Sequence, residues 1–518
     1  MKHSFYNIVK ITLLVSLIIS NSVLFAGPFD GDSIDEVITT KTKDSIESNN
    51  DSSISDKAVN KLASITNKLG SDINSLQMYL TDPAANIYLT IQETPKVSTY
   101  TSNIAQITVN KDETYQSIDG FGFALTGGSA YLLNKMSSKD RAEVLKKVYD
   151  PMFGIGASMI RISIGASDLS RKCFTYDEKF LGLGKDTNLN KFNIYAGDKE
   201  VIPMLKEILK INPNIKILAT PWTAPKWMKS NKLYGGGKLK EKYYQAYADY
   251  FLKYLQTMKD NGIKISAIST QNEPECGTNK PSMKMDANSQ ANFIGKYLGP
   301  TLEKNGFGDV EIFCWDHNCD KKDFALSVLN DSEANKYVSG SAWHLYAGDI
   351  NILSEVYKEQ PEKKLWLTEQ WTGRDGNFAG DFKWHMKNVI LGTLNNHGQA
   401  AFEWNLAADQ NCDPHTLGGC PDCKGALTIN KKTNKVDSYN VSYYIIGQAS
   451  KFVTPGSVKI SSSSTDDNLV NAAFVTTNGK IVVIVLNNGN KIVDFNIKHE
   501  DNIITSKLNA GAAATYIW

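Results

Sequence analysis

Two glutamates in this 518-residue chain occupy the same kind of place, at the end of an apolar and β-prone run. The run from Ile263 to Thr270 leads into Asn272-Glu273-Pro274, and proline cannot continue a central strand. A second run, Lys364 to Gln370, carries Glu369 near its end. Two carboxyl groups about 5–5.5 Å apart can hydrolyse a glycosidic bond with retention, because one attacks the anomeric carbon while the other protonates the leaving oxygen. The pair predicts this chemistry if the fold brings the two side chains together.

Other polar and aromatic residues end neighbouring strand patterns. Arg161 can hold a carboxylate ionised, and Tyr346 can donate a hydrogen bond to the same group. Asn272 is placed to bond a substrate hydroxyl next to the reacting carbon. Three further residues complete the predicted site. His344 lies two residues before Tyr346, and the rings of Trp222 and Trp404 could form the walls of a sugar site.

The middle of the chain alternates strand and helix patterns, and this alternation must position the two glutamates. Amphipathic helical patterns lie between most of the strands, for example at 138–149 and 241–259. The predicted strands are Ser117–Ala124, Ser158–Gly165, Lys216–Trp222, Ile263–Asn272, Glu311–His317, Ser341–Tyr346, Lys364–Gln370 and Ala400–Leu406. Eight such units predict an α/β fold, a (β/α)8 TIM barrel over residues 117–432, with the carboxylates at its C-terminal face.

Both flanks of this region read as short alternating strands without helices. Residues 84–116 supply the first of them, and residues 433–518 supply the rest, separated by turn signals such as Asn478-Gly479. These patterns predict an antiparallel β-sandwich side domain built from both chain ends.

The N-terminal part predicts export and a tether. Ile11 to Ala26 is almost wholly apolar, so residues 1–26 are expected to be a signal peptide and the protein secreted or periplasmic, with no stable membrane span. Residues 27–57 are polar and predict a disordered tether. Apolar residues at spacings of three and four predict an amphipathic helix over 58–82. Its stripe at 58–80 either docks on the catalytic body or binds a partner of unknown identity.

Composition and cysteine usage narrow the classes further. A net charge of +1 gives no sign of a nucleic-acid partner. Seven cysteines allow at most three disulfides and one free thiol. Cys412, Cys420 and Cys423 surround His415, but their spacing fits no common zinc module, so a loop tied by one disulfide is the expected arrangement.

Several motifs, in order from about residue 84 to the C-terminus, resemble glycoside hydrolase family 30, the glucosylceramidase family. They are Gln116–Gly122, Arg161–Asp168, Thr220–Met228, Gln271–Pro274, Trp343–Tyr346, Thr368-Glu369 and Glu403–Leu406. The resemblance implies Glu273 as acid/base and Glu369 as nucleophile, and it implies no metal or organic cofactor. It also implies that the subsite for the non-reducing sugar is lined by Arg161, Asp168, Trp222, Asn272, His344, Tyr346 and Trp404.

The expected activity is that of a retaining β-glucosidase-type hydrolase that cleaves β-linked glucose by double displacement, on a glucan or on glucosylceramide. The Phe121–Ser129 segment and the Gly418–Gly425 loop look more like microbial members that include β-1,6-glucanases, so an endo-β-1,6-glucanase is the alternative. A catalytically silent carbohydrate-binding protein is the alternative from another class. A scaffold or adhesion role would rest on the 58–80 stripe alone.

Overall fold

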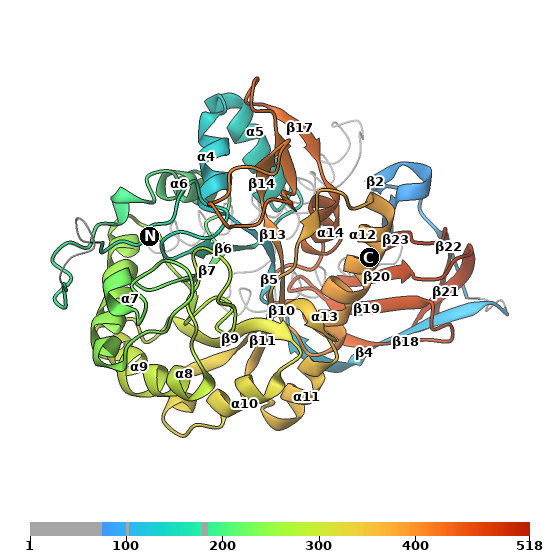
Figure 1. The fold of residues 1–518 in the computed structure, drawn as a ribbon. Coiled ribbons are helices and arrows are strands. Elements are labelled where there is room, and N and C mark those ends of the chain that lie inside the picture. The colour runs from blue at the N-terminus through green and yellow to red at the C-terminus, as the bar shows by residue number, and fades with distance from the viewer. Residues whose placement is uncertain (1–74, 100–102, 179–184) are drawn as a thin grey trace, which may run out of the picture. The chain divides into compact units, whose positions relative to one another are not determined.

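A computed structural model describes residues 75–99, 103–178 and 185–518 (Figure 1). The predicted signal peptide at 1–26, the tether at 27–57 and most of the helix predicted over 58–82 lie outside the described residues.

Eight parallel strands close into a barrel in the order β10-β11-β13-β5-β6-β7-β8-β9, which confirms the predicted TIM barrel. They are β5 (Gly120–Ala124), β6 (Met159–Ser163), β7 (Lys216–Thr220), β8 (Ala267–Ser269), β9 (Glu311–Cys319), β10 (Val338–Gly348), β11 (Lys364–Glu369) and β13 (Ala400–Asn405). Each lies within or around a predicted strand.

Helices connect successive barrel strands and cover the barrel's outer side (Figure 1). They are α4 (Gly127–Lys135), α5 (Ser138–Tyr149), α6 (Val201–Ile211), α7 (Tyr244–Asp260), α8 (Ala287–Phe293), α9 (Gly299–Lys304), α10 (Lys322–Leu329), α11 (Ile352–Glu359), α12 (Phe378–His385) and α13 (Gly392–Asn395). The helix α5 spans the range predicted for it, and its Ser137 cap accepts a hydrogen bond from the backbone N–H of Asp140.

A layer of apolar side chains fills the barrel interior, so the barrel is a packed core. Phe313 and Trp366 stack there with ring centroids 4.1 Å apart. Below them Asp119 accepts a hydrogen bond from the Trp366 indole at 3.0 Å and pairs with Lys216 and, at 3.1 Å, with Lys364. This cluster closes the N-terminal end of the barrel and leaves the C-terminal end for chemistry.

Strands from both chain ends form one ten-stranded arrangement, as predicted. Its order is β2-β1-β23-β20-β19-β18-β4-β21-β22-β3. The strands are β1 (Gln77–Asp82), β2 (Ile87–Ile91), β3 (Lys96–Ser98), β4 (Ala105–Ser117), β18 (Val458–Ser464), β19 (Leu469–Val475), β20 (Ile481–Asn487), β21 (Val493–His499), β22 (Asn502–Leu508) and β23 (Ala513–Ile517). Phe495 of β21 and Tyr516 of β23 have ring centroids 6.4 Å apart although their strands are not neighbours, so the two halves face each other across an apolar core.

The helix predicted over 58–82 is wrong at its C-terminal end, because residues 77–82 form β1. This strand pairs antiparallel with β2 and with β23. Leu76 and Leu80 fit the helical spacing, but Leu76, Met78 and Leu80 together have a period of two, and all three pack in the sandwich core. The cross-strand hydrogen bonds to the last strand of the chain decide between the two periods.

The sandwich strands also begin later than the predicted boundary at 433. Residues 433–457 contain β17 (Val436–Tyr439) and α14 (Val441–Ser450), with β17 pairing to β16 (Leu427–Ile429), which in turn pairs to β14 (Ala407–Asp409). Gln448 of α14 accepts from the Thr81 hydroxyl at 2.8 Å and donates to the Thr515 hydroxyl at 2.9 Å. The helix therefore joins the barrel to the sandwich.

Candidate active site

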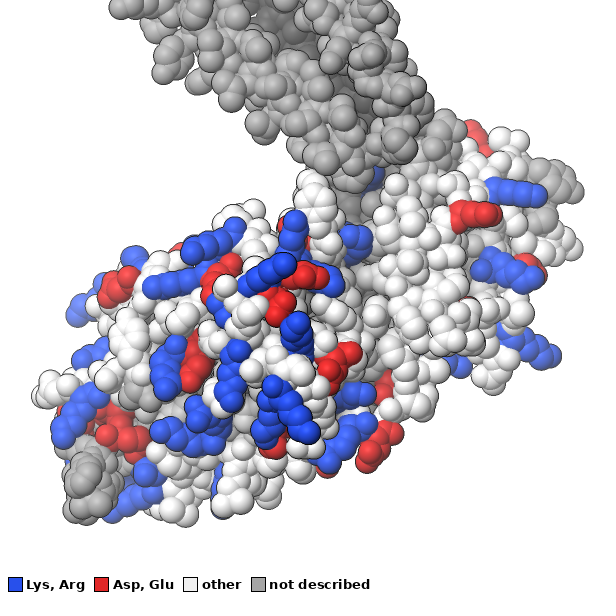
Figure 2. Space-filling model, turned by 90° about the horizontal axis from the view of Figure 1, so that it is seen from above, with Lys and Arg blue, Asp and Glu red and all other residues white. Residues whose placement is uncertain are grey.

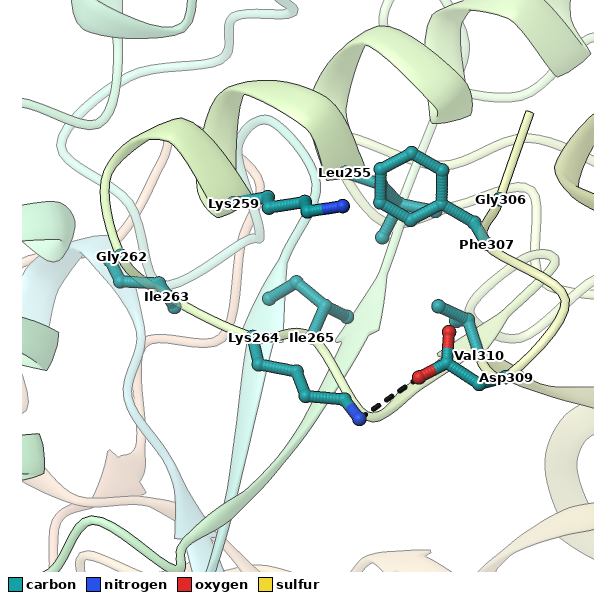
Figure 3. A pocket seen from close by; sticks show the side chains of 10 residues that line it. All are labelled: Leu255, Lys259, Gly262, Ile263, Lys264, Ile265, Gly306, Phe307, Asp309 and Val310. Atoms are coloured by element: carbon teal, nitrogen blue, oxygen red, sulfur yellow. Dashed lines mark ion pairs between the residues drawn. The ribbon is translucent and has the colours of Figure 1, made fainter.

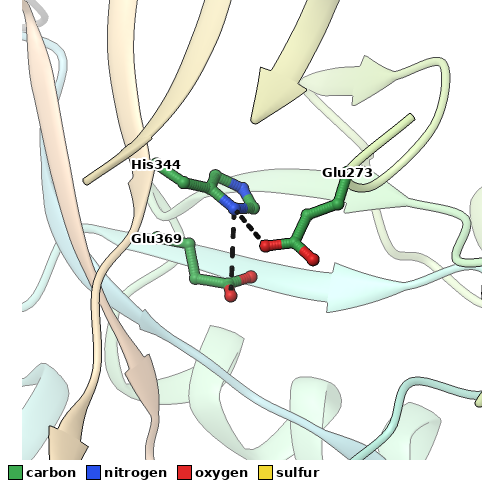
Figure 4. A group of neighbouring side chains, drawn as sticks. All are labelled: Glu273, His344 and Glu369. Carbon is green, nitrogen blue, oxygen red and sulfur yellow. Dashed lines mark hydrogen bonds and ion pairs between the residues drawn. The ribbon is translucent and has the colours of Figure 1, made fainter. Parts of the chain in front are cut away.

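The two glutamates meet at the C-terminal end of the barrel (Figure 4). Glu369 ends β11, and Glu273 follows β8 with a positive φ of 45°. One carboxylate oxygen of each lies within 4.8 Å of the other, and a ring nitrogen of His344 lies within the same distance of both. Such closeness suits two carboxyl groups acting directly on one sugar carbon, whereas inversion needs about 6.5–9.5 Å to leave room for water.

Glu369 is held by two donors. The guanidinium of Arg161, fully buried on β6, forms an ion pair with one carboxylate oxygen through Nη1. The hydroxyl of Tyr346 donates to the other oxygen at 2.9 Å. The structure thus brings both predicted partners of a nucleophilic carboxylate onto the same glutamate.

Glu273 has a different neighbour. Nδ1 of His344 lies 3.2 Å from one of its oxygens, and the adjacent Asn272 accepts a hydrogen bond from Nη2 of Arg161 at 2.7 Å. Burial opposes protonation of His344, but the carboxylates of Glu369, Asp316 and Glu273 outweigh it and raise the pKa of His344 to about 9. The ring is therefore an imidazolium at neutral pH.

The two catalytic candidates have pKa values shifted in opposite directions. Burial raises the pKa of Glu369 despite its cationic neighbours. Burial also opposes ionisation of Glu273, but the hydrogen bond and charge of His344 outweigh it and lower its pKa. Because the two carboxyl groups lie this close, the protonation of one alters the protonation of the other.

The predicted tryptophans lie together beneath Arg161. Trp222 and Trp404 stack with ring centroids 5.5 Å apart and an interplanar angle of 29°. The guanidinium carbon of Arg161 lies 5.0 Å from the first ring and 5.5 Å from the second. Both rings are buried, and they form an apolar base under the ion pair.

Asp168 lies in the loop after β6 and is buried. Its carboxylate accepts from the backbone N–H of Cys420 at 3.4 Å, and its carbonyl accepts from the backbone N–H of Thr416 at 2.7 Å. Burial, aided by the charges of Glu369 and Glu273, raises the pKa of Asp168 to about 7. The carboxylate therefore lies close enough to the glutamate pair to be affected by both charges.

The loop that braces Asp168 is tied by a disulfide between Cys420 and Cys423. The expectation of one bridge in this loop is confirmed, while Cys412 is a buried free thiol. The bridge places Cys423 in strand β15 (Cys423–Lys424), which pairs with β12 (Thr372–Gly373) just after Glu369.

Sequence reasoning missed one buried residue of this cluster, Asp316 of β9. Its carboxylate accepts from Arg161 at 3.0 Å and lies 3.1 Å from Nε2 of His344. Asp316 lies one residue before the end of the predicted strand Glu311–His317. The rule that selected side chains at strand ends could therefore have found this residue.

The spacing of Glu273, His344 and Glu369 would also admit a metal ion. Both ring nitrogens of His344, however, face carboxylates, and its raised pKa keeps both protonated at neutral pH. A protonated imidazole donates hydrogen bonds and offers no lone pair to a metal. The donor set fits charge pairing better than metal binding.

A cavity of about 350 Å³ lies at the other end of the barrel strands (Figure 3). It is enclosed by the C-terminal end of α7 and the segments that enter β8 and β9, with Lys264 and Asp309 paired at 2.9 Å on its rim. Because none of the predicted site residues lines this cavity, it is separate from the glutamate pair.

The charges on the described surface are mixed. In the face shown in Figure 2, lysine and arginine side chains alternate with aspartate and glutamate side chains.

Comparison with known proteins places these features in a family context. Residues 118–453 match the glycosyl hydrolase family 30 TIM-barrel domain, and residues 456–516 match the family 30 β-sandwich domain. The endo-1,6-beta-D-glucanase neg1 of Aspergillus fumigatus is 34% identical over 369 residues, covering 67% of this chain and 72% of that protein. The putative glucosylceramidase 1 of Caenorhabditis elegans is 30% identical over 410 residues, covering 74% and 76%. A solved endo-β1,6-glucanase structure aligns with a TM-score of 0.79 and 33% identity, covering 86% of this chain and 99% of that one.

Proposed function

The chain belongs to glycosyl hydrolase family 30, and from this premise we propose that it cleaves β-1,6-linked glucan by double displacement at Glu273 and Glu369. The observation that carries the proposal is the approach of the two carboxylates to within 4.8 Å at the C-terminal end of the barrel. The predicted family, the fold class and the assignment to retaining glycoside hydrolases acting on O-glycosyl bonds are confirmed by the domain matches.

In the first step Glu369 attacks the anomeric carbon while the bond from that carbon to the leaving oxygen breaks. Glu273 gives its proton to the leaving oxygen, so the departing alcohol is neutral. In the second step Glu273 takes a proton from water, the water oxygen attacks the same carbon, and the carboxylate of Glu369 departs.

The neighbouring residues support these steps. Arg161 and Tyr346 hold the Glu369 carboxylate in a fixed orientation for attack. Because the Asn272 oxygen accepts from Arg161, its amide nitrogen is the donor for a substrate hydroxyl. Asp168 and the paired tryptophans complete the subsite for the non-reducing sugar.

Azide separates the two glutamate roles. With an aryl β-glucoside that has a good leaving group, Glu369→Gly plus azide is expected to give the α-glucosyl azide, because azide replaces the nucleophile. Glu273→Gly plus azide is expected to give the β-glucosyl azide, because azide replaces water on the glycosyl–enzyme. Glu275→Gln, an exposed glutamate paired with Lys321, is the matched control and should keep full activity. Exchange of the two products would reverse the roles, and absence of both would refute the mechanism.

The substrate is tested separately. The names of the fungal relative and of the aligned structure support a β-1,6-glucan cleaved internally, which predicts short oligomers as early products. The nematode relative supports glucosylceramide as the second candidate, which predicts release of ceramide from detergent micelles. Glucose alone from the glucan would instead support an exo-acting β-glucosidase. A silent carbohydrate-binding protein would show binding without any of these products.

We also propose that residues 1–26 direct export of the enzyme. Among the described residues no helix is both long and apolar enough to cross a membrane. Expression of the full chain followed by N-terminal sequencing of extracellular or periplasmic protein tests the proposal, which fails if the protein stays inside the cell.

A further inference from the structure

Strand β9 is distorted where it faces the active site. Trp315 and Asp316 have positive φ angles of 69° and 63°, which bulky residues rarely adopt. The pairing to β10 skips one residue here, since Ala342 lies opposite Trp315 and Trp343 lies opposite His317. Asp316 is thus the extra residue of a bulge, a feature that re-aims a side chain next to active sites.

The re-aimed carboxylate has four partners and no exposed surface. One oxygen accepts from Arg161 at 3.0 Å and from the Ser269 hydroxyl at 2.5 Å. The other accepts from the Thr368 hydroxyl at 2.6 Å and lies 3.1 Å from Nε2 of His344. These contacts fix both oxygens, so Asp316 cannot turn away from either cation.

Arg161 and His344, the two cations that contact Asp316, each also contact one of the two catalytic glutamates. Arg161 pairs with Glu369 through Nη1, and His344 faces Glu273 through Nδ1 at 3.2 Å. Asp316 contacts both of these cations, so it lies behind the charged partner of each glutamate. Its contact with Nε2 leaves a single ring nitrogen of His344 to exchange a proton with Glu273.

We propose that Asp316 is a positioning residue for acid catalysis, which holds the Nε2 proton of His344 so that Nδ1 and Glu273 share the proton given to the leaving group. When Glu273 is to act as acid, the Nδ1–H bond breaks and an O–H bond forms on Glu273. His344 is then neutral and still donates from Nε2 to Asp316. This inference rests on the proposed function and assigns the source of the proton that the first step consumes.

Other groups also act on His344. They face it from four elements and are Glu273 after β8, Asp316 and His317 of β9, Tyr346 of its own strand and Glu369 of β11. Since most are present in an Asp316 variant too, the test must separate acid catalysis from a general disturbance of charge.

The dependence of kcat/KM on the leaving group of the substrate separates a loss of acid catalysis from a general disturbance of charge. The ratio kcat/KM reports the first step, which needs an acid for a poor leaving group and hardly needs one for 2,4-dinitrophenolate. For Asp316→Asn we expect kcat/KM to fall about 10²–10³-fold with phenyl β-glucoside and less than about 10-fold with 2,4-dinitrophenyl β-glucoside. Asp309→Asn, an exposed aspartate before β9, is the matched control and should change neither value.

Equal losses with both substrates would overturn the proposal, since a structural role or an effect through Arg161 lowers both alike. A measurement on the wild-type protein keeps the proposal testable if the variant does not fold. In ring-¹⁵N-labelled protein, with His344→Gln used for assignment, Nε2 should carry a proton from pH 5 to 8. An unprotonated Nε2 would refute the inference, while failure of the azide products would instead refute the proposed function.

Discussion

Lys229 offers a prediction about stability that depends on one buried charge. It follows the short 3-10 helix Lys226–Met228, and its side chain is fully buried. Its amine donates to the Thr223 hydroxyl at 2.7 Å and to the carbonyls of Tyr234 and Ser282 at 3.1 and 2.8 Å. It thereby clamps together the two loops that follow β7 and β8. Burial lowers the pKa of Lys229 from 10.5 to about 7.

Proton linkage determines whether the free energy of unfolding rises or falls with pH. Between pH 7 and 10.5 the unfolded chain binds a proton at Lys229 that the folded protein does not bind, so the stability rises with pH in this window. The slope approaches about 1.4 kcal/mol per pH unit above pH 8 and is half as steep at pH 7, which gives roughly 2 kcal/mol between pH 7 and pH 9. Below pH 7 both states bind the proton and the contribution is constant.

The substitution Lys229→Met removes the titration and keeps the apolar stem. We expect the free energy of unfolding of the variant, relative to wild type, to decrease by roughly 2 kcal/mol between pH 7 and pH 9. Urea unfolding at half-unit pH steps measures it. Lys210→Met on the exposed face of α6 is the control and should run parallel to wild type. Parallel curves for Lys229→Met would show that the buried amine stays charged and would refute the reasoning.

Three further predictions concern the barrel. The lysines around Asp119 lower its pKa although burial opposes this, so Asp119→Asn should lower the free energy of unfolding by about 3 kcal/mol at pH 7. This difference between variant and wild type should disappear as the pH falls below about 4. Urea midpoints from pH 3 to 7 test this, and an undiminished difference at pH 3 would contradict it. Trp404→Ala removes a ring from the stack under the buried guanidinium, and kcat/KM should fall roughly 30-fold while Trp404→Phe keeps most activity; equal losses would show that the ring face is not what matters. A methyl group at Gly122 would lie 1.8 Å from the Met159 carbonyl oxygen, so Gly122→Ala should destabilise by about 3 kcal/mol, whereas Gly308→Ala, with its nearest atom at 3.6 Å, should be nearly neutral in thermal unfolding.

Most of the barrel could be predicted from sequence because its strands are buried on both sides and read as apolar runs. Their carboxyl ends share one face of the barrel, so side chains at those ends could be assigned to one site. Glu273, Glu369, Arg161 and Tyr346 were found in this way, and the structure brings them into direct or shared contact. Asp168 was implied by the family resemblance and not by any strand pattern, and the contact of its carboxylate with the disulfide loop was not predicted.

Two structural features, strand β1 and the position of Asp316, depend on contacts between distant parts of the chain and could not be predicted from the local sequence pattern. Leu76 and Leu80 suit a helix and a strand equally well, and hydrogen bonds between β1 and β23 select the strand. The position of Asp316 in the site depends on a bulge in the pairing of β9 with β10. A bulge changes which side chains point inward without changing the apolar pattern, so the sequence could place Asp316 near a strand end but could not show that its carboxylate faces the site.

The interleaving of the two chain ends has a consequence for biosynthesis. Strand β1 lies between β2 and β23, and β23 is synthesised after all the other strands of this sheet. Until β23 is made, β1 has one open hydrogen-bonding edge, and such an edge can pair with other chains. The N-terminal edge of the sheet is therefore completed only once β23 has been made, and a chain truncated before β23 should expose the unpaired edge of β1.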